Sequence, residues 1–289
     1  MGDRWLPAVG VLRKRGPVDE PIIVAEGLTK TFTRYRRVAR WRRERVAFTA
    51  VDRIDLVVRA GELVGYIGPN GAGKSTTIKM LTGILMPTSG VLRVAGLEPQ
   101  RSRVKLARRI GVVFGQRTTL WWDLPLRDSF ALIQRLYRIP ETRYRENLDR
   151  YVEGLGLGSF MDQPVRQLSL GQRMRGDITA ALLHDPAIVY LDEPTIGLDV
   201  LSKHTVRDFL HELNRSMGTT ILLTTHDTGD IERLCSRVVA IDHGRVTYDG
   251  SVTELRAERD DLESAVKEMY LRGDVERGEE LEGQLPVER

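Results

Sequence analysis

The chain has 289 residues and a formal net charge of +4, with 41% hydrophobic and 29% charged side chains. These values are close to those of soluble globular proteins, so they exclude a wholly disordered chain and a collagen-like one. No apolar run approaches the roughly 18 residues that a membrane-spanning helix needs, so we expect any membrane association to be peripheral.

Residues 1–21 predict a flexible leader, because Gly16, Pro17 and Pro21 interrupt them and they show no periodicity. The leader lacks the continuous apolar stretch and cleavage site of a secretory signal, which indicates that the chain stays in the cytosol. The single cysteine, Cys235, excludes an internal disulfide framework, and we expect it to be a small buried apolar residue.

Strands and helices alternate along the rest of the chain. Strands are predicted at residues 22–25, 50–60, 63–67, 91–94, 187–191, 220–225, 238–241 and 246–248. A helix is expected over residues 75–86, ended by Pro87. Residues 124–167 carry apolar side chains at helical spacing, which predicts a helical insertion. The alternation indicates a mostly parallel α/β core with right-handed crossovers.

Charge is distributed unevenly along the sequence. Residues 34–45 hold seven arginines and one glutamate, whereas residues 254–289 hold twelve acidic and six basic side chains. The first run predicts an exposed hairpin without a specific partner, or contact with anionic lipid, a membrane subunit or nucleic acid. The second predicts a helical tail that frays beyond Arg272 and carries, at helical spacing, Leu262, Val266, Met269 and Tyr270.

The segment after the strand at 63–67 matches the G-x-x-x-x-G-K-[ST] pattern of a phosphate-binding loop. Its glycines let backbone N–H groups face a phosphate, and the following helix N-terminus adds partial positive charge. We expect Lys74 to reach the β- and γ-phosphates and Ser75 to ligate magnesium; the alternative is a glycine-rich turn without a ligand. The residues assigned to nucleotide binding are Gly68, Pro69, Asn70, Gly71, Ala72, Gly73, Lys74, Ser75 and Thr76.

Two further strands end in side chains suited to catalysis. Asp192 and Glu193 follow the strand at 187–191, and sheet topology should place them beside the phosphate loop. Asp192 is suited to hold magnesium, directly or through water, and Glu193 to act as general base; capping carboxylates are the alternative. His226 ends another apolar strand and can contact the γ-phosphate, unless it is a satisfied core histidine.

Together with these motifs, other segments resemble the ATP-binding cassette family. Residues 168–172, Leu-Ser-Leu-Gly-Gln, resemble its signature motif, Gln116 its glutamine loop, residues 197–199 its aspartate loop and His226 its switch histidine. The resemblance covers about residues 22–250. Leu170 departs from the commonest signature, which has glycine there, but Ser169 and Gly171 are retained.

The family's architecture is an α/β P-loop NTPase core with a mostly parallel sheet, an N-terminal antiparallel β subdomain and an inserted α-helical subdomain. The resemblance therefore implies one nucleotide-binding domain over residues 22–250, with the helical subdomain at about residues 118–170. Residues 251–289 would form an acidic helical tail.

The resemblance also implies a mechanism with ATP and Mg²⁺. Two copies of the chain would face head to tail, so that each ATP lies between one copy's phosphate loop and the other's signature residues, Ser169, Gly171 and Gln172. The implied catalytic residues are Glu193, His226, Gln116 and Lys74. The implied metal ligands are Ser75, Gln116 and Asp192. Gln116 would also transmit closure to the helical lobe.

The Leu170 variant and the segments 192–200 and 224–227 resemble the branch of drug and antibiotic exporters. The resemblance implies an ATPase subunit on the cytoplasmic face of the membrane, held by separate polytopic transmembrane subunits. Their cytoplasmic helices would dock near Trp121 and Trp122, unless these two side chains pack within the helical lobe.

Adenine requires an aromatic face, which the family supplies between its first two strands. Phe32 is the first candidate and Tyr35 the second; either could instead be an ordinary packing residue.

Two other functions remain open at this point. A soluble cassette protein could act on nucleic acid or ribosomes, although only the arginine run favours this and no specific nucleic acid is expected. A pure binding module could use nucleotide only as a conformational switch; turnover abolished by Glu193→Gln would reject it.

Overall fold

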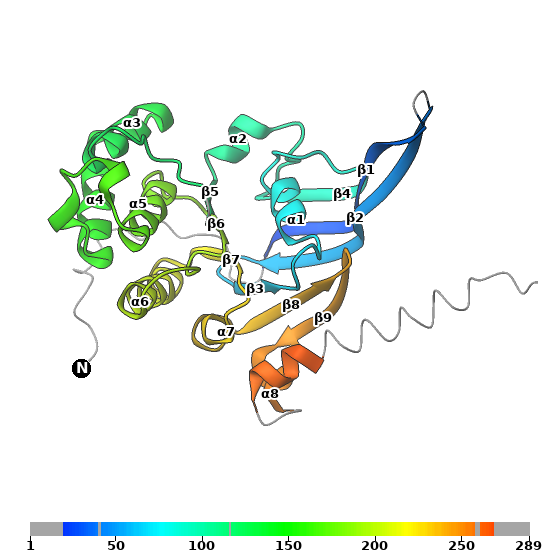
Figure 1. The fold of residues 1–289 in the computed structure, drawn as a ribbon. Coiled ribbons are helices and arrows are strands. Elements are labelled where there is room, and N and C mark those ends of the chain that lie inside the picture. The colour runs from blue at the N-terminus through cyan, green and yellow to red at the C-terminus, as the bar shows by residue number, and fades with distance from the viewer. Residues whose placement is uncertain (1–19, 40–41, 116, 258–260, 269–289) are drawn as a thin grey trace, which may run out of the picture.

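The computed structural model describes residues 20–39, 42–115, 117–257 and 261–268. A three-stranded antiparallel sheet has the order β2-β1-β4, formed by Arg42–Arg59, Pro21–Ala39 and Ser89–Val94. It lies beside the central sheet, on the side opposite the helices α3 and α4 (Figure 1). This sheet is the antiparallel β part that the resemblance implies.

β1 and β2 are much longer than the strands expected at residues 22–25 and 50–60. The two strands pair from Pro21 with Arg59 as far as Ala39 with Arg42. Backbone hydrogen bonds between them continue beyond the core, so this part of the hairpin needs no periodic apolar face. The arginine-rich segment is therefore a hairpin in its backbone, with residues 40–41 outside the described part.

The central sheet has six strands in the order β5-β6-β7-β3-β8-β9. β5 (Ile110–Phe114), β6 (Ile188–Asp192), β7 (Thr220–Thr224), β3 (Leu63–Ile67) and β8 (Arg237–Asp242) are parallel. β9 (Arg245–Ser251) pairs antiparallel with β8. The prediction of a mostly parallel α/β core is confirmed.

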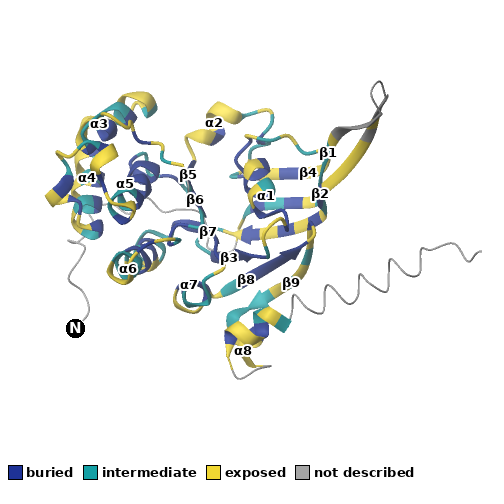
Figure 2. Ribbon diagram, in the orientation of Figure 1, coloured by how far each residue is buried: buried dark blue, intermediate teal, exposed yellow. Residues whose placement is uncertain are grey.

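The parallel strands are buried on both faces, as Figure 2 shows. Along β6, Ile188 and Tyr190 belong to one apolar cluster, whereas Val189 and Leu191 belong to the other. Alternate side chains of a strand point to opposite faces, so each face of the sheet carries its own core. The carboxyl ends of β3, β6 and β7, where the motifs lie, meet at one edge of this sheet.

The helix after β3, α1, is shorter than predicted. It spans Lys74–Leu81 and not residues 75–86. Gly83 adopts a left-handed φ of +73°, and its N–H donates to the carbonyl of Met80 at 3.0 Å. Glycine favours this conformation just after a helix, which explains why α1 ends several residues before Pro87.

A helical lobe lies between β5 and β6. It contains α3 (Leu126–Tyr137), α4 (Glu141–Leu155), two 3₁₀ turns (Gly158–Phe160 and Val165–Gln167) and α5 (Leu170–Leu182). The predicted helical insertion is thus present. The remaining helices are α2 (Arg103–Ala107), α6 (Val200–Met217), α7 (Thr228–Leu234) and α8 (Val252–Ala257).

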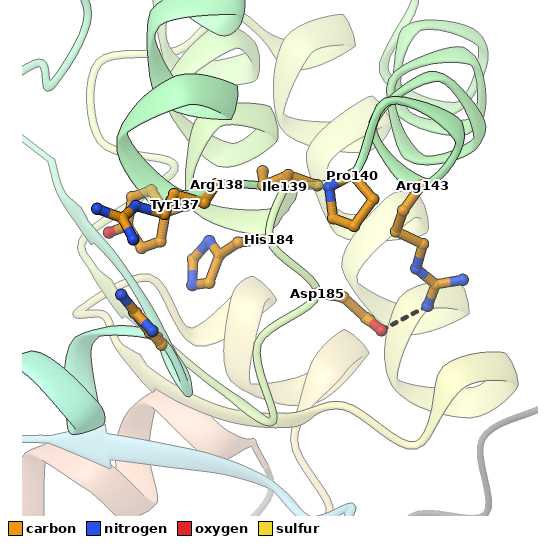
Figure 3. Close-up of a pocket in the computed structure, with 8 residues that line it drawn as sticks. Tyr137, Arg138, Ile139, Pro140, Arg143, His184 and Asp185 are labelled. Carbon is orange, nitrogen blue, oxygen red and sulfur yellow. Dashed lines mark hydrogen bonds and ion pairs between the residues drawn. The ribbon is translucent and has the colours of Figure 1, made fainter.

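A polar seam joins the helical lobe to the core at the amino ends of β5 and β6 (Figure 3). The rings of Tyr137 and His184 stack with centroids 4.2 Å apart. Arg143, on α4, pairs with Asp185 at 2.6 Å, the contact that the dashed line marks. The Asn147 side chain donates to the carbonyl of Leu183 at 2.9 Å. This end of the lobe is fixed to the core far from the strand ends that carry the motifs.

The structure also bears on the predictions for Cys235 and for the C-terminal tail. Cys235 is buried beside Gly65, and burial raises the pKa of its thiol to about 12, so it is the inert apolar residue expected. Residues 262–268 are helical, and Leu262 and Val266 pack on the chain's own core. Met269, Tyr270, Arg272 and the leader lie outside the described residues. Among the helices described, none is both long and apolar enough to cross a membrane.

Candidate functional site

The phosphate loop runs from the end of β3 to the start of α1. Gly73 precedes α1 with φ +111°, and Gly71 has φ +85°, both left-handed values that favour glycine. A Cβ on Gly73 would lie 2.5 Å from the carbonyl oxygen of Ala50, whereas one on Gly71 would meet no atom within 4 Å. The loop is therefore closely packed at Gly73 and open at Gly71. No side chain caps α1, which leaves its first backbone N–H groups available to a phosphate.

Lys74 is folded back over this loop. Its Nζ donates to the carbonyls of Gly68 at 2.6 Å and Pro69 at 3.1 Å. Burial lowers the pKa of the ammonium, although Glu193 and Asp192 act in the opposite direction. A buried ammonium whose hydrogen bonds go to neutral carbonyls is suited to an anionic ligand, which would stabilise the charge more strongly.

Ser75 and Asp192 bring two oxygen donors together. The Ser75 hydroxyl donates to Asp192 Oδ2 at 3.2 Å, and the Thr224 hydroxyl holds Oδ1 at 2.6 Å. In the described part of the chain, no three His, Cys, Asp or Glu side chains gather into a metal site. Mg²⁺ is commonly bound by one or two protein oxygens together with phosphates and water, so this donor pair fits it.

Glu193 leaves the end of β6 in an unusual conformation. Its φ is +55°, and its N–H donates to the carbonyl and the hydroxyl of Thr224, at 3.0 and 3.1 Å. Its Oε1 lies 3.3 Å from Nδ1 of His226, whose side chain is 61% exposed. A left-handed non-glycine residue held by a neighbouring strand is typical of functional sites. The alternative that His226 is a core histidine is wrong.

The phosphate loop, Asp192 and Glu193 surround a cavity of about 960 Å³. His226 is not among its lining residues and is placed by its contact with Glu193. From the predicted set it is lined by Phe32, Asn70, Gly71, Gly73, Lys74, Ser75, Thr76, Asp192 and Glu193. Eight other lining residues were not predicted as site residues from the sequence: Thr33, Phe48, Ala50, Lys79, Ile84, Phe114, Gly115 and Arg117. The side chain of Tyr35 and all of Gln116 lie outside the described part of the structure.

Phe48 is a second aromatic candidate for adenine. It pairs directly with Phe32 across β1 and β2, and both line the cavity. Paired positions place side chains on the same face of a sheet. Recognition of the strand pairing would have been needed to find Phe48 from sequence.

The signature residues lie at the start of α5. Ser169 caps the helix, and its side chain and that of Gln172 form a reciprocal capping box. Gly171 packs closely against α6, since a Cβ there would lie 2.5 Å from Ser202 Oγ. Ser169, Gly171 and Gln172 are not among the residues that line the cavity described above. One chain therefore does not bring its signature to its own phosphate loop.

The site is a glycine-rich loop between a buried parallel strand and a helix, with a lysine, a serine and an aspartate beside it. These features define a P-loop protein that binds nucleoside triphosphates. A family model described as ABC transporter matches residues 51–196. The chain is 34% identical to the ABC transporter ATP-binding protein NatA of Bacillus subtilis, over 71% of this chain and 83% of NatA. It therefore belongs to the ABC transporter family, as an ATP-hydrolysing subunit whose substrate is ATP.

Other relatives agree with this assignment. The chain is 40% identical to the daunorubicin/doxorubicin resistance ATP-binding protein DrrA of Streptomyces peucetius, over 72% of this chain and 62% of DrrA. A solved ATP-binding subunit of an ABC transporter superposes with a TM-score of 0.72 and 26% identity, over 87% of this chain and 98% of that one. A dimeric cassette bound to ADP and Pi gives 0.68 and 25%, over 80% and 98%. The expected fold is confirmed.

Proposed function

We propose that this chain powers the export of a drug-like or antibiotic-like small molecule through separate transmembrane subunits. The proposal is supported by Leu170 in the signature and by relatives named for daunorubicin and doxorubicin resistance. Its energetic part is supported by Glu193, which lines the cavity together with the phosphate loop and lies 3.3 Å from Nδ1 of His226. A cassette acting on nucleic acid is not favoured, because the named relatives are transporter proteins.

The working unit in this proposal is a homodimer. The signature residues lie outside the chain's own cavity, so a second copy is needed to place Ser169 and Gly171 against the phosphates. Two apolar side chains beside the aspartate loop, Val200 and Leu201, are 70% and 79% exposed. Such side chains are suited to burial between copies, and a related cassette is dimeric.

Within each site, Lys74 and the loop N–H groups hold the β- and γ-phosphates. Ser75 and Asp192, with Gln116, are the proposed ligands of Mg²⁺, which supplies charge neutralisation when it is bound. Glu193 accepts a proton from the attacking water, and His226 keeps the Glu193 carboxylate in place and faces the γ-phosphate. Phe32 offers a stacking face for adenine.

The membrane subunits are proposed to dock on the helical lobe near Trp121 and Trp122. These side chains are 40% and 50% exposed, and the Arg173 guanidinium lies 5.7 Å from the Trp122 ring centroid. Aromatic side chains beside arginine are favoured at interfaces. A related protein, CbiO1 of Clostridium perfringens, is described as part of the transporter complex CbiONQ.

In this proposal the protein works on the cytoplasmic face of the membrane, with residues 22–250 as the nucleotide-binding domain and residues 251–289 as a tail. The hairpin that contains residues 34–45 is proposed to reach the anionic lipid surface. Each basic side chain near such a surface contributes about 1 kcal/mol.

Steady-state ATPase assays of Glu193→Gln test the catalytic part. Loss of a positioned general base lowers turnover by about 10² to 10⁴, while ATP affinity is retained because the phosphate loop is intact. Glu232→Gln, an exposed change on α7, is the matched control and should be neutral. Unchanged turnover in Glu193→Gln contradicts the assigned role. Affinity purification from native membranes tests the transport part, and failure to recover any polytopic protein would contradict it.

A further inference from the structure

One buried carboxylate has no part in the function proposed so far. Asp177 lies in the middle of α5 and is 6% exposed. Its Oδ1 accepts three hydrogen bonds, from the Thr118 hydroxyl at 2.9 Å, the Thr119 N–H at 2.9 Å and the Thr119 hydroxyl at 3.2 Å. Three donors converging on one oxygen hold it in a single position.

The segment held by Asp177 leaves the nucleotide cavity. Phe114, Gly115 and Arg117 line that cavity, and Thr118 follows directly. Further along, the Trp121 N–H donates to the buried Ser129 hydroxyl on α3 at 3.2 Å. The side chains that fix residues 118–121 thus come from the helical lobe. This segment moves with the lobe if the lobe moves.

The helix that carries Asp177 also carries the signature. Ser169 caps α5 eight residues before Asp177, which is about 12 Å along a helix. The far end of the lobe is held to the core at the seam of Figure 3, where Arg143 pairs with Asp185. α5 therefore joins the signature, which meets the partner's nucleotide in the proposed dimer, to residues 118–119, which follow the residues that line the chain's own cavity.

A negative charge at this position is unfavourable for folding. Burial raises the pKa of Asp177 to about 6, against the hydrogen bonds from Thr118 and Thr119. Arg173, one turn earlier on α5, is the charged side chain whose field favours the ionised form. A neutral side chain would avoid the cost of burying the charge. A buried carboxyl with a raised pKa, next to a segment that lines the nucleotide cavity, is a candidate for a functional role.

We propose that Asp177 is a positioning residue for ATP hydrolysis. Its hydrogen bonds lock the segment after Gln116 to α5, the helix that begins at the signature. Contact of the signature with the partner's nucleotide is thereby transmitted to the chain's own catalytic site. The proposal rests on the roles proposed above for Glu193 and the signature. In the part of the chain that the structure describes, the Asp177 carboxylate accepts hydrogen bonds from Thr118 and Thr119, and we assign its effect to these two residues.

Asp177→Asn in the full chain tests the proposal by steady-state ATPase assays and by ATP binding at equilibrium. The asparagine Oδ1 still accepts hydrogen bonds, but it lacks the charge that strengthens all three of them, so the segment is held less firmly. We therefore expect kcat to fall at least about fivefold, with KM and the Kd for ATP within about twofold of wild type. Thr179→Val is the matched control. Thr179 is also buried on α5, and among the described residues its hydroxyl donates to the carbonyl of Arg175 on the same helix.

The ratio of wild-type to variant kcat distinguishes positioning from a general structural role. Below about pH 6 the wild-type carboxyl becomes protonated, so the ratio should approach one there. Thr119→Val, at an exposed position, removes one donor without threatening the fold. It should lower kcat by about two- to tenfold, and the double variant should lose less than the product of the single effects.

Four results would overturn the proposal: a kcat for Asp177→Asn equal to that of Thr179→Val, a ratio independent of pH, an equal loss in ATP affinity, or multiplicative effects in the double variant. Glu193→Gln, assayed in parallel, separates the two hypotheses. If Glu193→Gln stays active, the proposed catalytic site is wrong. If Glu193→Gln is inactive and Asp177→Asn is normal, only the role of Asp177 is wrong.

Discussion

Replacement of Asp177 by asparagine also predicts a pH-dependent change in folding stability. In the folded chain, burial raises the pKa of this carboxyl from the ordinary 3.8 to about 6. Between these two values the folded state keeps a proton that the unfolded state has released. The wild-type free energy of unfolding therefore falls as the pH rises from about 4 to 6, and it stays lower above that. The amide does not titrate.

The size of the effect follows from the pKa values. One pKa unit corresponds to about 1.4 kcal/mol, so the whole shift is worth about 3 kcal/mol. About 1.4 kcal/mol of it lies between pH 5 and pH 8, because only the last unit of the shift falls in that window. The free energy of unfolding of Asp177→Asn minus that of wild type should rise by this amount from pH 5 to pH 8.

Urea unfolding of both proteins at pH 5, 6, 7 and 8 measures this difference. The amide must also find an acceptor, and a buried donor without one costs about 1–3 kcal/mol. That cost is the same at every pH, so it changes the absolute difference and not its slope. A difference that is flat within about 0.5 kcal/mol, or one that falls as the pH rises, would refute the account of Asp177.

Two other substitutions test the framework around the site. Asp230 is fully buried and accepts hydrogen bonds from Arg207, Thr195 and Thr225. Asp230→Ala should therefore lower the free energy of unfolding by about 3 kcal/mol. A loss under about 1 kcal/mol in urea unfolding would contradict this. Gly73→Ala should weaken ATP binding, measured by titration calorimetry, at least about tenfold, because Gly73 has a left-handed φ and lies close to the Ala50 carbonyl. Gly96→Ala is the control. Gly96 also has a left-handed φ, but a Cβ there would meet no atom within 4 Å, so this variant should bind ATP normally.

The sequence predicted what depends on local chemistry. The phosphate loop, the carboxylates after β6 and the histidine after β7 each follow a recognisable apolar strand. Parallel topology then places all three strand ends at one edge. Lys74, Ser75, Asp192 and Glu193 therefore meet as expected.

What the sequence did not predict depends on pairing between distant segments. The length of the β1–β2 hairpin is set by cross-strand hydrogen bonds, and so is the position of Phe48 opposite Phe32. α1 ends early because Gly83 adopts a left-handed conformation, which no pattern required. Asp177 looked like one more polar residue on a helix until its contacts with Thr118 and Thr119, nearly 60 residues earlier, were visible.

In the proposed mechanism, two copies of the chain enclose ATP between one copy's phosphate loop and the other copy's signature. Light scattering coupled to size exclusion, on Glu193→Gln at saturating Mg-ATP, measures this most directly. We expect twice the monomer mass of 32.7 kDa with ATP. We expect the monomer mass without ATP, or when Lys74→Ala is added to Glu193→Gln. A Glu193→Gln protein that binds ATP and stays monomeric, even with its membrane subunits supplied, would contradict the claim.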